Sequence, residues 1–312
     1  MAGGATVLKE MRMQSKALAI AAVAALAVVA VHGQAAQTGV KPASAGPDVK
    51  GILYEAANSL GMLRSIQERE SIATQEYWAT GNMSAGGQTA KIGAYRISLD
   101  YPSQAMRVDF TRTGADGKPQ RDIQVVAGNF AWNETEPGKG GPPAPAAVRE
   151  RLLQLWSWPI GVVKAATLAG ANAKVSMEGG FLMLTFPLPA PLADVTMKAT
   201  LDRNNKHFVL WSQEPEAKAR LAKRVLPLYR HKPDLVGLYI VRVEARFGNA
   251  VTDITYGEYG DWNPDDNKAD IMTPRRVARK DGNTTWDLRI TATNTYNPYV
   301  LMRVPANVRT AN

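Results

Sequence analysis

Residues 237–305, GLYIVRVEARFGNAVTDITYGEYGDWNPDDNKADIMTPRRVARKDGNTTWDLRITATNTYNPYVLMRVP, read as consecutive antiparallel strands. Apolar and charged residues alternate over 239–247 and again over 286–293, and this period of two is typical of strands with one buried face. Gly248-Asn249 and Asp281-Gly282-Asn283 are turn signals between such strands. Short turns join antiparallel neighbours, so this stretch predicts a sheet with one apolar face and one charged face.

The totals of the chain exclude several chemistries. It has 312 residues, of which 45% are hydrophobic, enough for one large domain with its own core. It has no cysteine, which excludes disulfides, thiol catalysis and zinc-thiolate sites. The net charge of +9 suits an acidic partner, but a basic surface without a specific partner explains it equally well.

The N-terminus reads as a secretory signal. Lys9, Arg12 and Lys16 precede an apolar run over 17–31 that is shorter than the roughly 20 residues of a membrane-spanning helix. Small residues around Ala35 predict cleavage after it, so that 1–35 is the signal peptide and 36–47 a flexible linker. An uncleaved membrane anchor is the alternative. The expected location is therefore periplasmic or secreted.

Residues 48–312 are expected to form a single domain. Asp48 is a predicted N-cap for a helix that ends near Gly61. A meander of strands follows at 72–83, 91–101, 105–113, 121–127 and 130–132. Helices are predicted at 148–158 and 160–168, separated at Pro159, and hairpins at 174–186 and 194–212.

Three segments stand apart from this pattern. Residues 136–147 are rich in Pro and Gly and predict an extended excursion. Residues 214–235 predict a basic helical insertion that either is solvated or meets an envelope protein or a membrane surface through Lys218, Arg220, Lys223 and Arg224. The loop Asp261–Asn267 alternates possible calcium ligands, but it lacks the glycine and the final glutamate of an EF-hand, so a solvated acidic loop is preferred.

No catalytic motif is found in the sequence. His207 and His231 are isolated, so neither a metallo-β-lactamase cluster nor a Ser-His-Asp triad can be assembled from the sequence. No phosphate-binding glycine loop and no nucleophile elbow is present, and the basic residues are not interleaved with aromatic ones as in a nucleic-acid binder. We expect no catalytic residue, cofactor or metal.

The remaining candidate is an apolar concave surface. A curved sheet covered by the helices could hold an acyl chain on its inner face. The predicted ligand-binding residues on that face are Trp78, Met106, Phe110, Phe181, Met183, Tyr239, Val241, Trp286, Leu288 and Ile290. The same residues could instead fill a closed core.

The closing stretch resembles the LolA/LolB-like superfamily of periplasmic lipid and lipoprotein carriers. The resemblance is carried by YGEYGDW (256–262), IMTPRRVARKDGNTTWDLRITA (271–292), Asn297 and Val304-Pro305. Over most of 50–300 the chain is also similar to the β-rich region that precedes the catalytic part of some secreted metallo-β-lactamase-fold hydrolases, through segments such as VVAGNFAWN (125–133) and ERLLQLWSWPIGVVKAA (150–166). The likeness implies a half-barrel with a helical cover and no catalysis, because the hydrolase part has no counterpart here.

We therefore expect a mainly β, α+β fold, in which a strongly curved, half-open antiparallel barrel has a few helices on its concave face. The expected function is non-catalytic binding of a hydrophobic ligand, a lipid or acyl chain. A β-module that docks on a separate envelope hydrolase is the second hypothesis, and an unrecognised hydrolase is the third.

Overall fold

The computed structural model of this protein describes residues 47–63, 72–203, 237–248, 250–261, 271–295 and 297–311. All of them belong to one compact unit, Ala45–Asn312. The predicted signal peptide, nearly all of the linker, the basic insertion with Lys218, Arg220, Lys223 and Arg224, and most of the candidate calcium loop lie outside the described residues.

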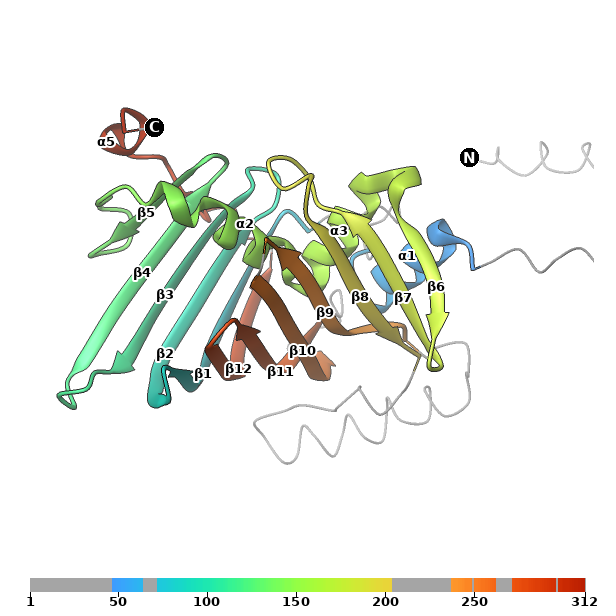
Figure 1. Ribbon diagram of the computed structural model, residues 1–312, viewed down its shortest axis with the longest axis horizontal. Coiled ribbons are helices and arrows are strands. Elements are labelled where there is room, and N and C mark those ends of the chain that lie inside the picture. The colour runs from blue at the N-terminus through green and yellow to red at the C-terminus, as the bar shows by residue number, and fades with distance from the viewer. Residues whose placement is uncertain are drawn as a thin grey trace, which may run out of the picture. The chain divides into compact units, whose positions relative to one another are not determined.

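A single open sheet forms the body of this unit (Figure 1). Its 12 strands run in the order β5-β4-β3-β2-β1-β12-β11-β10-β9-β8-β7-β6, and every neighbouring pair is antiparallel. The sheet is curved and unclosed, which confirms the predicted half-barrel. The strands are β1 Thr74–Ala85, β2 Gln88–Asp100, β3 Ala105–Thr113, β4 Pro119–Ala127, β5 Phe130–Glu134, β6 Lys174–Glu178, β7 Phe181–Pro187, β8 Thr196–Asp202, β9 Tyr239–Phe247, β10 Ala250–Asp261, β11 Met272–Asp281 and β12 Thr284–Thr295.

The first and last strands meet in the middle of the sheet. β1 pairs with β12 along most of its length, from Gln75 opposite Thr295 to Ala85 opposite Thr284. Gly81 permits a close approach here, because a Cβ atom at this position would lie 2.0 Å from the carbonyl oxygen of Asp287. The closing stretch therefore completes a sheet that the N-terminal meander begins.

Helices cover one face of the sheet (Figure 1). They are α1 (Val49–Ser59), α2 (Val148–Ser157) and α3 (Pro159–Ala169), close to their predicted bounds. α1 and α3 contact strands of the β6–β9 half, and α2 contacts β3, β4 and β5. Asp48 caps α1 by accepting hydrogen bonds from the backbone of Lys50 and Gly51 at 3.2 and 3.0 Å, which confirms the predicted N-cap.

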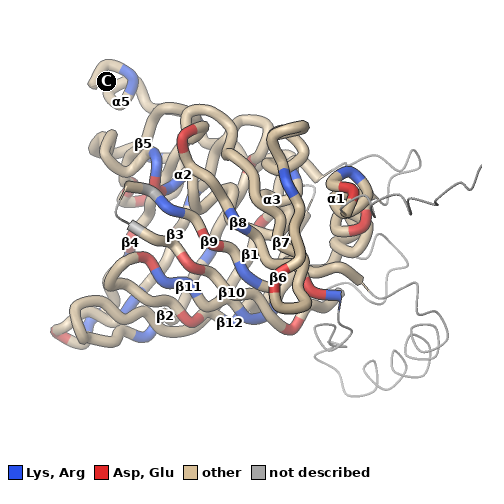
Figure 2. The backbone as a smooth tube through the Cα atoms, turned by 45° about the vertical axis from the view of Figure 1, so that its right-hand side comes forward, with Lys and Arg blue, Asp and Glu red and all other residues tan. Residues whose placement is uncertain are grey.

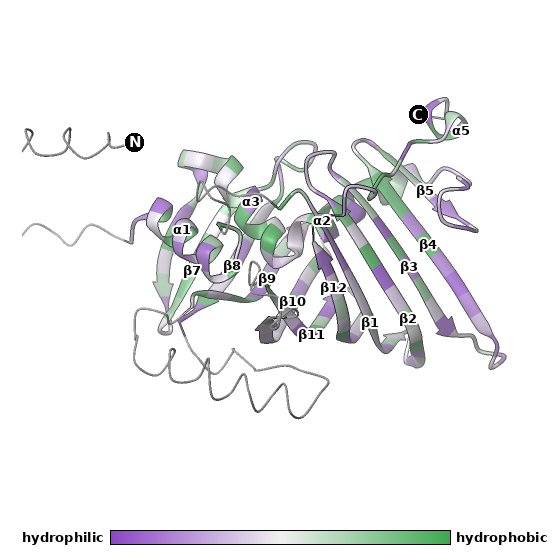
Figure 3. Cartoon of the chain, turned by 180° about the vertical axis from the view of Figure 1, so that it is seen from behind, coloured by the Kyte–Doolittle hydropathy of each residue, from purple (hydrophilic) through white to green (hydrophobic). Residues whose placement is uncertain are grey.

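The main core lies between the sheet and these helices, and aromatic rings fill it. Tyr77 of β1 stacks on Trp158 at a centroid distance of 4.3 Å, and Phe110 meets Trp286 edge to face at 5.2 Å. The strands alternate between hydrophobic and hydrophilic residues, and α3 is largely hydrophobic (Figure 3). This packing leaves the two layers in direct contact.

The opposite face of the sheet is not uniformly charged, because over β3–β5, outside the strands for which one apolar and one charged face were predicted, it also carries apolar residues. A second cluster there contains Ile123, Val125 and Trp132, together with Val300 and Met302 of the C-terminal segment. This segment ends in the short helix α5 (Ala306–Arg309), next to β5. Over the described residues, Lys and Arg are interspersed with Asp and Glu along the strands (Figure 2).

Two further predictions are corrected or refined. β8 pairs with β7 on one edge and with β9 on the other, so it leaves no free edge for the second half of the predicted hairpin, 207–212, which lies outside the described residues. The Pro/Gly-rich excursion 136–147 returns along the edge of β5, where Trp132 and Pro143 form an antiparallel bridge.

Candidate functional site

An apolar groove of about 770 Å³ lies between α1 and α3. Helix α1 provides one wall and α3 the other, while the β2–β3 turn and the end of α2 close it. Most of the lining is apolar, which is the character of sites that bind small hydrophobic molecules. The apolar and aromatic lining residues are Val49, Leu53, Tyr54, Ala57, Met62, Leu63, Tyr101, Pro102, Trp156, Val163 and Leu168.

The position of α1 is fixed at its C-terminal end and at its middle. The amide of Leu238 donates to Ser59 Oγ at 2.8 Å, and the amide of Met272 donates to the carbonyl oxygen of Leu60 at 3.2 Å. Arg203, just after β8, donates to both carboxylate oxygens of Glu55 at 2.9 and 2.5 Å. These contacts tie α1 to the sheet, while the apolar side of its first two turns faces the groove.

The position of α3 depends on a close approach to α2. Pro159 starts α3 at a position where a missing amide hydrogen costs no helical bond. A Cβ atom on Gly161 would lie 2.8 Å from the carbonyl oxygen of Leu155 and 3.1 Å from the ring of Tyr101. Glycine therefore allows α3 to pack tightly here, which brings Val163 to the groove wall.

The mouth of the groove carries charge. Lys50 and Lys164 line it with Asp48, whose carboxylate is engaged in capping α1. The Lys164 Nζ lies 5.3 Å from the ring centroid of Tyr101, so its ammonium group is held against an aromatic face. An amphiphile could place its chain on the apolar lining and its polar end beside these two lysines.

None of the ten predicted ligand-binding residues lines this groove. Six of them face the packed core between sheet and helices. They are Met106, Phe110, Tyr239, Trp286, Leu288 and Ile290. Their contact with a ligand stays a prediction. Five of them are buried among protein side chains, while Trp286 is half-buried and also lines a separate pocket beside Arg279 and Lys280.

Three others lie on the opposite face from the predicted one. Trp78 sits under the guanidinium of Arg96 at 5.1 Å, because the adjacent Tyr77 takes the inward position. Phe181 and Met183 share the opposite face of β7, since Leu182, Leu184 and Phe186 are the residues in the core.

The tenth residue, Val241, lies at an irregularity in the pairing of β8 and β9. Thr200 pairs with Arg242 and Leu201 with Ile240, which leaves Val241 as the extra residue on β9. Val241 is half-buried and belongs to neither hydrophobic cluster. Strict alternation from Tyr239 to Val243 could not anticipate this shift.

The ligand-site prediction from the sequence considered only the strands and did not include the groove residues of α1, because this helix has two apolar sides. Ile52 and Ala56 face the sheet, as an amphipathic helix requires. Val49, Leu53 and Ala57 follow at a spacing of four and form a second stripe toward α3. This second stripe is the sequence signal that could have indicated a further apolar surface.

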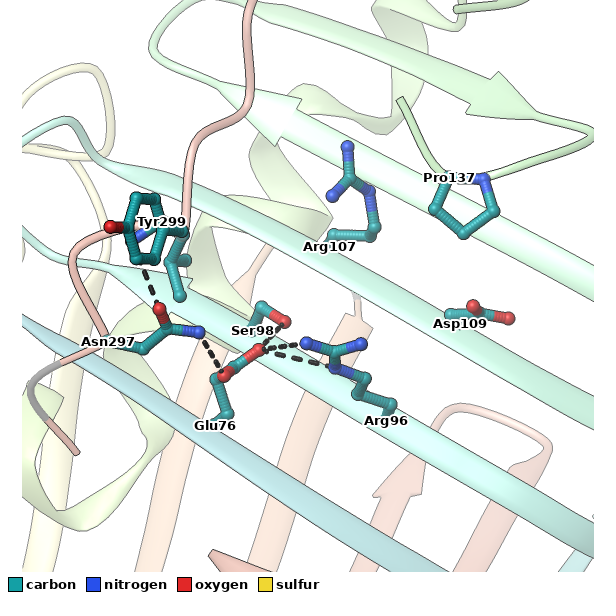
Figure 4. Close-up of a pocket in the computed structure, with 9 residues that line it drawn as sticks. Glu76, Arg96, Ser98, Arg107, Asp109, Pro137, Asn297 and Tyr299 are labelled. Atoms are coloured by element: carbon teal, nitrogen blue, oxygen red, sulfur yellow. Dashed lines mark hydrogen bonds and ion pairs between the residues drawn. The ribbon is translucent and has the colours of Figure 1, made fainter. Parts of the chain in front are cut away.

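A separate polar pocket of about 70 Å³ lies on the other face of the sheet (Figure 4). Its centre is the Glu76 carboxylate, which accepts hydrogen bonds from Arg96 Nη2, Ser98 Oγ and Asn297 Nδ2, each at 2.7 Å. Burial raises the pKa of Glu76, but these hydrogen bonds and the charge of Arg96 outweigh it and hold the pKa below its usual value. The pocket anchors the C-terminal segment through Asn297, and its other charged lining residues, Arg107 and Asp109, are paired with Glu134 and Arg121 outside it.

The described residues offer no metal centre, since no three His, Asp or Glu side chains among them gather as ligands. None of the described helices combines the length and the apolar character that crossing a membrane requires.

Comparisons with known proteins return structural similarity only. No family model and no curated protein matches the sequence. The chain is similar to a LolA superfamily protein from Nitrosomonas europaea at a TM-score of 0.38 and 9% identity, over 83% of this chain and 96% of that one. It is similar to a DUF1329 family protein from Desulfovibrio piger at a TM-score of 0.33 and 7% identity, over 80% of this chain and 94% of that one. It is also similar to LprF from Mycobacterium bovis at a TM-score of 0.31 and 11% identity, over 85% of this chain and 100% of that one.

Proposed function

We propose that this protein is an exported, non-catalytic carrier that binds a lipid or an acyl chain in the groove between α1 and α3. The groove itself is the observation that supports this proposal. Its volume of about 770 Å³ falls within the roughly 300–1,000 Å³ of small-molecule sites, and its lining is mostly apolar. Export rests on the basic and apolar pattern of the first 35 residues.

The energetics favour a long aliphatic ligand. Each buried CH₂ group contributes about 0.8 kcal/mol, so about a dozen of them would provide roughly 10 kcal/mol. That sum exceeds the lower estimates of the free energy lost on immobilising a small molecule. Lys50 and Lys164 at the mouth would meet the head group.

A partner surface completes the proposal. The basic stretch 214–235, with Lys218, Arg220, Lys223 and Arg224, would meet an acidic envelope protein or an anionic membrane surface during loading or delivery. The periplasm, or the exterior of the cell, is the compartment in which such transfer would occur.

The proposal can be tested by a substitution that places a large side chain in the groove from its exposed side. Thr167 of α3 lines the groove and is exposed, so Thr167→Trp can enlarge a side chain without entering the core. We expect the indole to displace two or three methylenes of the ligand, about 1.6–2.4 kcal/mol, and to weaken binding of a fluorescent fatty acid roughly 15- to 60-fold. Glu150→Trp on α2, also exposed but outside the groove, is the control and should bind as the unmodified chain does.

A second measurement tests directly whether the purified protein carries a lipid. Native mass spectrometry after gentle purification should show a co-purified lipid on the unmodified chain and less of it on the Thr167 variant. A chain that carries no lipid and binds no fluorescent fatty acid would contradict the proposal and favour the docking module instead.

A further inference from the structure

The two outer edges of the sheet, β5 and β6, differ in whether other residues of the chain cover them. At β5, residues of the Pro/Gly-rich excursion cover the edge. The amide of Asn133 donates to Pro142 O at 3.1 Å, and the amide of Ala144 donates to Ala131 O at 2.8 Å. Covering an edge in this way prevents it from pairing with another chain.

The β6 edge has no such cover within the part of the chain that the structure describes. β6 pairs with β7 through a two-residue turn, in which Gly179 and Gly180 have φ of 56° and 86°. The residues that close such a hairpin, Glu178 and Phe181, form a hydrogen-bonded pair. By alternation, Val175 and Met177 direct their backbone amides and carbonyls outward, and no hydrogen bond to another described residue is found for them.

The side chains at this edge are also incompletely covered. Val175 and Met177 are cross-strand neighbours of Leu184 and Leu182, so they lie on the face that carries the main core. Met177 is nevertheless 58% exposed, because the sheet ends beside it. A further strand on this edge would bury that apolar surface.

We propose that a second copy of this chain pairs with β6 edge to edge, antiparallel, about a twofold axis at Ser176. The sequence KVSME (174–178) is self-complementary in this register. Lys174 would lie opposite Glu178 of the second copy, and Val175 opposite its Met177, each contact occurring twice. Other strands that lack this charge pattern would meet Lys174 and Glu178 without compensation, which selects the second copy as the occupant.

The contact joins the two sheets into one through their outward backbone groups. Val175 and Met177 would form hydrogen-bonded pairs across the axis, and their side chains would cover one another on the core-bearing face. Glu178 already accepts a hydrogen bond from Lys198 at 2.8 Å, so Lys174 of the second copy would complete a small ion-pair network. Because two five-residue strands bury little surface, we expect a weak dimer with a Kd of roughly 10–100 µM.

The first test measures association directly. Sedimentation velocity of the purified chain from about 5 to 500 µM should show monomer converting to dimer. Val175→Pro removes an outward amide without removing a bond to β7, so it should abolish the dimer while leaving the urea midpoint close to that of the unmodified chain. A monomer at all concentrations, or an unchanged Kd in the proline variant, would overturn the proposal.

A charge-exchange experiment keeps the test decisive should the proline variant fail to fold. Lys174→Glu and Glu178→Lys each place like charges opposite one another and should weaken self-association about tenfold. The mixture of these two variants, and the double variant, restores opposite charges and should recover the dimer. Failure of the mixture to associate more tightly than either variant alone would also overturn the proposal, and neither result depends on ligand binding in the groove.

Discussion

Replacement of Glu76 by glutamine tests the hydrogen-bonded network that holds the C-terminal segment to the sheet. The carboxylate is 1% exposed and accepts hydrogen bonds from Arg96, Ser98 and Asn297. Glutamine keeps the shape but removes the charge, and its amide nitrogen must face one of these donors.

The expected loss can be worked out from the exposure of the partners. Breaking a fully buried ion pair costs about 3–5 kcal/mol, but the Arg96 side chain is 49% exposed and can turn to water. A net hydrogen bond to a charged group contributes about 1.5–3 kcal/mol. Glutamine retains an acceptor oxygen, so we expect Glu76→Gln to lower the free energy of unfolding by about 2–3 kcal/mol at pH 7.

The dependence on pH follows from the direction of the pKa shift. The folded pKa of Glu76 lies below the unfolded value of 4.5, so its ionised form stabilises the fold above that pH. This contribution is lost as the pH falls through the folded pKa. The difference between the unmodified chain and the glutamine variant should therefore be constant above about pH 5.5 and shrink below about 4.5.

Urea unfolding at pH 7, 5.5, 4.5 and 3.5, followed by tryptophan fluorescence, measures this difference. Asp287→Asn is the control, because the Asp287 side chain is 56% exposed and its pair with Arg276 spans 3.6 Å, so its loss should stay below about 0.5 kcal/mol. A difference for Glu76→Gln below 1 kcal/mol at pH 7, or one that does not shrink at pH 3.5, would refute the reasoning.

Two further predictions concern the packing of the unit. Trp158→Ala should lower the free energy of unfolding by about 3–5 kcal/mol in urea melts, because it removes the ring stacked on Tyr77 in the main core. Gly81→Ala should cost about 2 kcal/mol or more in the same assay, since the new Cβ would meet Asp287 O at 2.0 Å, whereas Gly93→Ala, with no atom within 4 Å, should change stability by less than 1 kcal/mol. Equal effects of the two glycine substitutions would show that β1 and β12 do not approach as described.

The described architecture has a consequence for how a ligand would be released. The groove walls are α1 and α3, and neither belongs to the sheet, while the aromatic contacts of the core hold the sheet and helices together beneath them. Small displacements of α1 could widen the groove without breaking strand pairing. The contacts that would resist such a movement include the Arg203–Glu55 ion pair, the hydrogen bonds from Leu238 to Ser59 and from Met272 to Leu60, and the burial of Ile52 and Ala56 in the core.

The sequence by itself determined the local elements of this protein. The period of two over β12, the Asp48 cap and the break at Pro159 depend on residues within a few positions of one another, so their outcome could be read directly. The curved, open antiparallel sheet with a helical cover is also confirmed, but it was expected from the resemblance and not from local pattern alone, because it depends on the pairing of β1 with β12 from opposite ends of the domain.

Only the tertiary structure decided which surfaces face one another. In β7 both faces are apolar, so alternation alone could not choose between Leu182 and Phe181 as the core residue, and pairing with β8 together with helix packing made the choice. The groove lies between α1 and α3, which are about a hundred residues apart in the chain. Its α3 wall is positioned by the close approach of Gly161 to Leu155 and Tyr101, which no local pattern reveals. The free energy that selects these arrangements comes from burial between distant segments, which is a property of the whole fold.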